Sequence, residues 1–182
     1  MNIAELFSGF GAIREALFTD LSLWWVLAPI VVLWVSMEVY FGEYKREQLG
    51  FSSALANGIS LSWIAFSALR LFFSEGFSIG APEFYALAFF AIYGVFVVVI
   101  AFRHAFSPRV VNYLAAPSLI YLFSTLAVLW GQNLLEISIP VLAALLIILA
   151  IIWGFFALLK RQLGILGEIE AVRRAGDNDK EV

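Results

Sequence analysis

Ionisable side chains inside long apolar stretches are the residues of this chain most capable of chemistry. Glu38 lies near the end of the apolar stretch 21–41, and a carboxylate at membrane depth is costly unless it is paired or functional. It also opens the charge-dense run 38–50. Within this run we define a polar cluster of Glu38, Glu43, Tyr44, Lys45, Arg46 and Glu47. The cluster could bind a cation, a lipid headgroup or a partner, and the alternative is a solvated loop with internal ion pairs.

Polar and small residues also follow helical spacing in the apolar stretch 53–73. At about 100° per residue, one arc of the helix carries a polar stripe of Ser53, Asn57, Ser60 and Ser67. Beside it lies a close-packing stripe of Ala54, Gly58 and Ser62. Small residues let two membrane helices approach closely, and polar ones can hydrogen-bond across the contact. We therefore expect this helix inside a bundle, where the polar stripe either packs helices or lines a path for a solute.

Catalytic and metal-binding patterns are missing from the sequence. The chain has no Cys and a single His, which excludes thiol nucleophiles and zinc clusters of the common types. It contains no zinc-protease, serine-hydrolase, phosphate-loop or dinucleotide motif. His104 follows Arg103 at an expected helix end, where it can cap carbonyls. We expect no catalytic residue, no metal and no cofactor, and a lipid-modifying enzyme that uses Glu38 stays open as the less favoured alternative.

The composition determines the class of protein that must position these residues. Of 182 residues, 63% are apolar and 14% are charged, and the mean hydropathy is +0.94. Soluble domains carry roughly a quarter charged residues, so lipid must solvate much of this chain. The net charge of −3 offers no broad basic surface and argues against nucleic-acid binding.

The apolar stretches predict an all-α integral membrane protein with a bundle of about five transmembrane helices. Each stretch can cross a hydrocarbon core of roughly 30 Å; they run over 21–41, 53–73, 83–103, 109–131 and 138–159. Pro29 and Pro117 lie within two of these stretches and predict kinks. The chain is expected to form a single membrane domain.

Amphipathic segments flank the predicted spans. Residues 1–19 place apolar side chains at helical spacing, as in a helix that lies in the membrane interface. Residues 160–175 continue an apolar stripe with basic neighbours and predict a cytoplasmic extension that contacts lipid or a partner helix. Residues 176–182 are expected to be disordered.

The basic residues predict the orientation in a cell membrane. One side of a five-span chain would carry Lys45, Arg46, Arg103, Arg109, Lys160, Arg161, Arg173, Arg174 and Lys180. The other side would carry only Arg14 and Arg70. The positive-inside rule then places the N-terminus outside and the C-terminus in the cytoplasm.

Three functional hypotheses follow from this pattern. The favoured one is a small membrane-embedded interaction or structural subunit that contacts lipid and associates with itself or with another membrane protein. The alternative is a homo-oligomeric ion channel or small-solute transporter in which the second helix lines the path and Glu38 lies at its inner mouth. The third is the lipid-modifying enzyme.

Overall fold

The protein is described by a computed structural model that covers residues 2–43, 50–74, 76 and 79–178. These residues form helices and connecting turns without a strand. The helices are α1 (Ile3–Phe18), the short η1 (Leu21–Leu23), α2 (Trp24–Glu43), α3 (Phe51–Ser74), α4 (Pro82–Arg103), α5 (Pro108–Leu114), α6 (Pro117–Gly131) and α7 (Ile139–Asn178).

Five helical segments of the described chain are long and apolar enough to cross a membrane. They run over Leu21–Tyr40, Phe51–Ser74, Pro82–Arg103, Pro108–Gly131 and Ile139–Leu159. The chain is therefore a multi-pass membrane protein, and the predicted all-α membrane bundle is confirmed.

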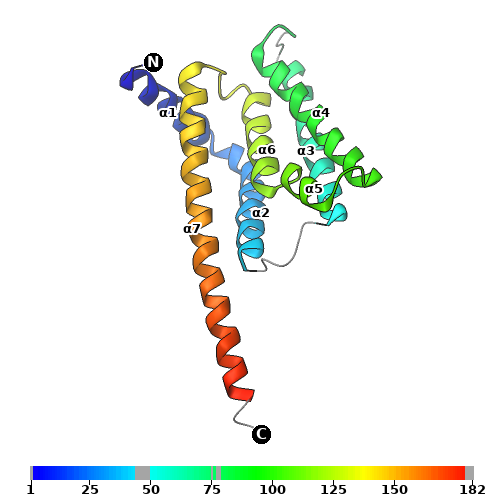
Figure 1. The fold of residues 1–182 in the computed structure, drawn as a ribbon. Coiled ribbons are helices and arrows are strands. Elements are labelled where there is room, and N and C mark those ends of the chain that lie inside the picture. Colours follow the sequence, from blue (N-terminus) through cyan, green and yellow to red (C-terminus); the bar gives the residue numbers. More distant parts are fainter. Residues whose placement is uncertain (1, 44–49, 75, 77–78, 179–182) are drawn as a thin grey trace.

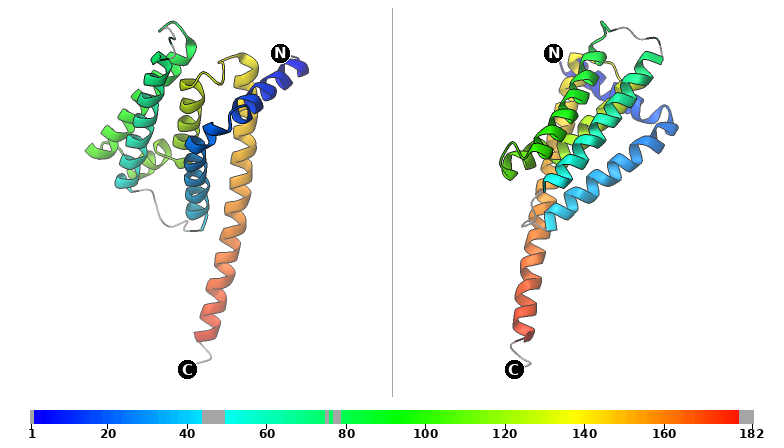
Figure 2. Two further views of the ribbon diagram at one scale, coloured as in Figure 1. Left: turned by 180° about the vertical axis from the view of Figure 1, so that it is seen from behind. Right: turned by 90° about the vertical axis from the view of Figure 1, so that its right-hand side faces the viewer.

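The helices form two groups that meet at α6 (Figures 1 and 2). On one side α3 packs against both α4 and α6, and on the other α2 packs against α6 and α7. In an 18-residue window of the span that contains α6, 61% of the residues are buried, whereas in such a window of the spanning part of α7 only 17% are. The centre of the bundle is thus α6, and α7 lies at its margin.

Small residues bring α3 and α4 into close contact. A side chain added at Gly94 would come within 2.5 Å of the Ser62 hydroxyl oxygen, and one added at Gly58 would come within 2.9 Å of the Gly94 carbonyl oxygen. Ser62 donates its own hydrogen bond back to the Gly58 carbonyl at 2.8 Å. Ala54, Gly58 and Ser62 are all buried in this contact region of α3.

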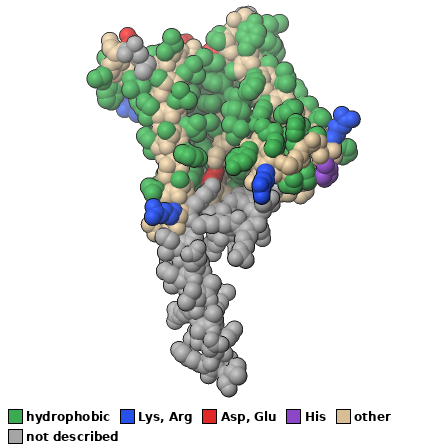
Figure 3. Space-filling model, viewed as in Figure 1, with side chains coloured by type: hydrophobic (Ala, Val, Ile, Leu, Met, Phe, Trp, Pro, Cys, Tyr) green, Lys and Arg blue, Asp and Glu red, His purple; other side chains and the backbone are tan. Residues whose placement is uncertain are grey.

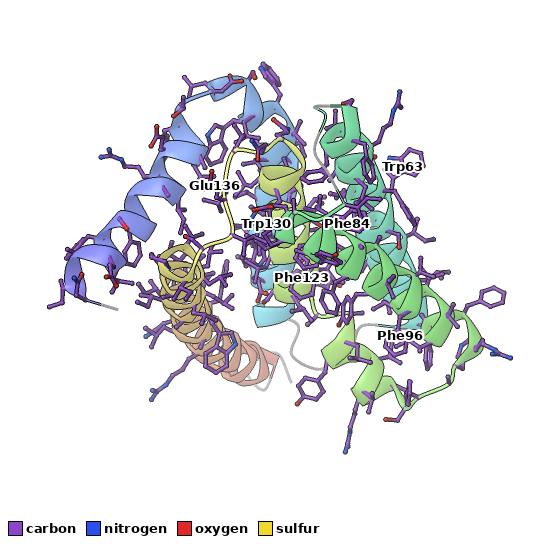
Figure 4. The ribbon with its side chains drawn as sticks, turned by 90° about the horizontal axis from the view of Figure 1, so that it is seen from above. Trp63, Phe84, Phe96, Phe123, Trp130 and Glu136 are labelled. Carbon is purple, nitrogen blue, oxygen red and sulfur yellow. The ribbon has the colours of Figure 1, made fainter. Side chains whose placement is uncertain are left out.

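Aromatic rings fill the space between α4 and α6. The Phe90 ring stacks on Phe123 with centroids 4.5 Å apart and on Trp130 with centroids 5.6 Å apart. Figure 4 shows Phe123 and Trp130 within the bundle, whereas Trp63 points outward from α3. Stacked rings bury large apolar areas and hold the two helices at a fixed separation.

The first helix packs on the beginning of the last. A capping box starts α1, since the Glu5 N–H donates to Asn2 Oδ1 and the Asn2 N–H donates to the Glu5 carboxylate. A side chain at Gly9 would collide with the carbonyl group of Pro140 in the first turn of α7. Glycine at position 9 therefore permits the contact between the two helices.

A tight turn joins α1 to α2 through η1. Ser22 donates its backbone N–H and its hydroxyl to the Asp20 carboxylate, both at 2.8 Å. These two hydrogen bonds favour the charged form and hold the pKa of Asp20 below its ordinary value. The carboxylate thereby caps the entry into the first span.

The α7 helix differs from the expected C-terminal organisation. It continues without interruption from the spanning segment through 160–175 and ends at Asn178. Residues 176–178 are thus helical where the sequence predicts a disordered tail, and residues 179–182 lie outside the described residues.

Candidate functional site

The fourth span is broken between Leu114 and Pro117. The sequence predicts one kinked helix over 109–131, but the structure has α5 and α6 as separate helices, and α5 turns toward α4 (Figures 1 and 2). Pro117 has no N–H to donate and begins a new helix instead. With 15 residues α6 is about 22 Å long, which is shorter than the hydrocarbon core.

Two backbone carbonyls at the break receive hydrogen bonds from side chains of other helices. The Tyr93 hydroxyl on α4 donates to the Leu114 carbonyl at 2.7 Å. The Asn57 amide on α3 donates to the Ala115 carbonyl at 3.0 Å. An unsatisfied carbonyl at membrane depth costs several kcal/mol, so these two side chains make the interruption tolerable.

The carboxylate of Glu38 on α2 lies on the α6 side of the break. Glu38 is 3% exposed, and the Ser118 hydroxyl in the first turn of α6 donates to its carboxylate. The N-terminal end of a helix carries partial positive charge and stabilises an anion. The first turn of α6 is therefore suited to hold Glu38 within the bundle.

We call the group of Glu38, Asn57, Tyr93 and Ser118 the break site. Three other helices, α2, α3 and α4, each contribute one of these side chains, and α6 contributes the fourth. Its carboxylate accepts the hydrogen bond from Ser118, while the tyrosine and the asparagine donate to backbone carbonyls at the break. Among the described residues no group of His, Asp and Glu is arranged to hold a metal ion.

The structure separates the members of the predicted polar stripe. Asn57 is buried and bonded at the break, and Ser53 is half-buried. Ser60 and Ser67 are exposed on the outside of α3, facing away from the bundle. Asn57 therefore belongs to the break site, and the two exposed serines do not.

The predicted polar cluster is only partly described. Glu38 lies in the break site, and Glu43 ends α2. Tyr44, Lys45, Arg46 and Glu47 lie outside the described residues. Pro29, the other predicted kink residue, lies inside the continuous helix α2.

Tyr93 was not singled out from the sequence. It sits in the middle of the apolar stretch 83–103, and tyrosines of membrane helices usually mark interfaces. The available signal for Tyr93 was that the chain also carries a proline within a span. Such a proline frees a backbone carbonyl that needs a donor, and a tyrosine in the middle of another span can supply it.

Three buried polar atoms lack a hydrogen-bond partner among the described residues: Trp34 Nε1, Ser124 Oγ and Trp130 Nε1. Trp34 precedes Glu38 by one helical turn on α2, and Ser124 follows Ser118 on α6. The interior near α6 thus contains polar groups whose hydrogen-bonding capacity is unused.

The chain matches no protein-family model, no curated protein and no solved structure.

Proposed function

We propose that this protein is a membrane-embedded interaction or structural subunit that binds a protein partner through the part of α7 beyond the bundle. The observation that supports it is the length of α7. Its 40 residues give a helix of about 60 Å, roughly twice the thickness of the hydrocarbon core. In Figures 1 and 2 its C-terminal half extends away from every other described helix.

A helix that projects alone into water needs a neighbour to be stable. In proteins most of the stability of a helix comes from packing of its apolar face rather than from intrinsic propensity, and this part contains Gly164 and Gly167, each unfavourable by about 1 kcal/mol relative to Ala. A partner helix that covers the apolar stripe predicted for 160–175 supplies the missing stabilisation. The partner is another membrane protein or a second copy of this chain.

The proposal is tested by shortening α7. A chain that ends at Gln162 keeps the contacts that the described side chains make within the bundle, the last of them from Leu159, and a chain that ends at Asn178 is the matched control. We expect the first to insert and fold but to lose the higher-mass assembly, measured by chemical crosslinking in membranes followed by mass determination of the purified complex. Equal assembly masses for the two chains, or monomers in both, would overturn the proposal.

A second candidate function is proton or small-cation transport through the break site. It is favoured by the buried carboxylate of Glu38, because ionisable groups within spans commonly mark ion pathways. Purified protein in liposomes with a pH-sensitive dye inside would then show flux that Glu38→Gln abolishes and Ser60→Ala leaves unchanged. Absence of flux under every imposed gradient would eliminate this candidate.

We also propose that the N-terminus lies outside and the C-terminal end of α7 lies in the cytoplasm. The support is the distribution of charge. Figure 3 shows arginine side chains along the lower edge of the apolar surface, over the end of α4, over α5 and over α7. The cysteine-free chain allows a direct test with single cysteines.

The matched positions for that test are Ser8 on α1 and Ser107 before α5, both exposed. Ser8→Cys should react with a membrane-impermeant maleimide on intact cells, and Ser107→Cys only after permeabilisation. The reverse pattern would invert the proposed orientation.

A further inference from the structure

The connection between α4 and α5 forms an exposed corner that combines positive charge with apolar rings. We call residues 102–113 the α4–α5 corner. Arg103 ends α4, Arg109 lies in the first turn of α5, and both are exposed. Figure 3 shows basic side chains at this end of the apolar surface.

Neither arginine of the corner has an acidic partner among the residues that the structure describes. The sequence contains no Asp or Glu between Glu83 and Glu136. In the described part of the structure, Arg103 and Arg109 take part in no ion pair. Two guanidinium groups are thus left available for an anion from outside the chain.

Apolar and aromatic side chains surround the two charges. Phe102 is 75% exposed and Tyr113 is 81% exposed, and Phe106 and Val110 are exposed beside them. Aromatic rings of this kind settle at the membrane interface, with their apolar parts in the acyl region. The arginines and the rings together therefore suit an anion that is attached to an acyl chain.

The corner is held in a fixed shape from both ends. His104 adopts a left-handed conformation with φ of 50°, and the Ala105 N–H donates to the Ile100 carbonyl at 3.1 Å, which closes α4 with a Schellman-type cap. The His104 ring packs on Phe51 at the start of α3, with centroids 4.0 Å apart. At the other end, the Tyr93 hydroxyl holds the Leu114 carbonyl that ends α5.

We propose that the α4–α5 corner binds the phosphate-bearing headgroup of an anionic phospholipid. Arginine recognises phosphate through several N–H donors in a planar fork. The two exposed guanidinium groups supply the charge, and the exposed rings accommodate the acyl chains. Because the end of α4 is capped and α5 is anchored at the break site, the backbone that carries the two arginines is already ordered before the lipid binds.

The experiment uses the full chain in vesicles of phosphatidylcholine mixed with phosphatidylglycerol. A photoactivatable analogue of either lipid is added in trace amount, and adducts are mapped by peptide mass spectrometry. We expect the phosphatidylglycerol analogue to label the corner in preference to the phosphatidylcholine analogue. Arg103→Gln and Arg109→Gln should each lower that labelling roughly fivefold, and the double variant about 30-fold.

The matched control is the double variant Arg14→Gln and Arg70→Gln, which removes two exposed arginines from the other edge of the bundle. It should leave labelling of the corner unchanged. Equal labelling by the two lipid analogues, or full labelling of the double variant lacking Arg103 and Arg109, would overturn the proposal.

A salt titration of the unmodified chain tests the same proposal even if the double variant that lacks Arg103 and Arg109 does not fold. Rising ionic strength should reduce labelling by phosphatidylglycerol and spare labelling by phosphatidylcholine. Labelling by both lipids that is independent of salt would overturn the proposal. Both lipids occupy both leaflets of these vesicles, so the result does not depend on the proposed orientation or on a partner for α7.

Discussion

The broken span α5–α6 and the continuous helix α7 satisfy their backbone hydrogen bonds within the membrane in opposite ways. The first is interrupted and contains hydroxyl groups, yet it lies in the centre of the bundle and its freed carbonyls are bonded by Asn57 and Tyr93. The second is nearly free of polar side chains in its spanning part, and only 17% of the residues in an 18-residue window of this part are buried. An interruption is tolerated only where neighbouring helices complete the backbone hydrogen bonds, whereas a helix that faces lipid must complete its own.

The largest expected difference between the two regions comes from truncating an apolar side chain in each. Ile120 on α6 is 0% exposed, and Leu146 on α7 is 67% exposed. Ile120→Ala leaves a cavity and should lower the free energy of unfolding by about 2–5 kcal/mol. Leu146→Ala should change it by less than about 0.5 kcal/mol. Unfolding of the purified protein in mixed micelles measures both, and equal losses would contradict the assignment of α6 as the enclosed helix.

A second comparison adds a methyl group at a glycine of each region. At Gly131, which ends α6, the new Cβ would lie 2.6 Å from the Cβ of Ala68, whereas nothing lies within 4 Å of one at Gly154 on α7. Gly131→Ala should destabilise the protein by about 1–3 kcal/mol through overpacking. Gly154→Ala should stabilise it by about 0.5–1 kcal/mol through helix propensity. The sign of the difference is the test, and it is read from paired unfolding curves.

The hydrogen bonds of the break provide a third test. Asn57→Ala leaves the Ala115 carbonyl without its donor and should cost about 1–2 kcal/mol, and Tyr93→Phe should cost about 1 kcal/mol. Ser67→Ala, on the exposed side of the same helix as Asn57, should have an effect within about 0.5 kcal/mol. Hydrogen exchange adds a local readout, since the amides of α5 should exchange faster in the first two variants. Unchanged exchange in α5 would show that the break is held in another way.

The smallest expected effect is an increase in the free energy of unfolding. Ser124 is buried on α6 and its hydroxyl has no partner among the described residues, whereas the Thr125 hydroxyl donates to the Tyr121 carbonyl at 2.9 Å. Removing an unsatisfied buried hydroxyl should raise the free energy of unfolding, by up to about 1 kcal/mol for Ser124→Ala. Thr125→Ala should bring no gain. A loss of stability in Ser124→Ala would show that its hydroxyl is bonded in solution.

The number and type of the membrane helices could be predicted from the sequence because both depend on local properties. Long apolar stretches can only be accommodated in lipid, and prolines mark where helices begin. Pro117 also predicted a local distortion of the fourth span. Whether that distortion is a kink or a complete break depends on donors from distant segments, and these become neighbours only after the helices pack.

The candidate site was less predictable for the same reason. Glu38 and Asn57 stood out because they are polar within apolar surroundings, but their partners are a serine and a backbone carbonyl more than fifty positions away. Tyr93 gave a weaker signal, because its apolar ring is compatible with a membrane span and only its hydroxyl contributes to the site, by donating to the Leu114 carbonyl. The division of the polar stripe into buried Asn57 and exposed Ser60 and Ser67 depends on which face of α3 packs against α4 and α6, and the sequence of α3 alone does not specify that face.

The contact between Gly9 and Pro140 also determines the order in which the protein can be assembled. During synthesis α1 leaves the ribosome before the described spanning helices, yet its docking surface is the first turn of α7, the last of them in chain order. The face of α1 that contains Ile13 and Ala16 is buried in the finished fold, where α1 packs mainly against α7. The contact therefore joins the two ends of the described chain and can form only after the spans between them have been synthesised.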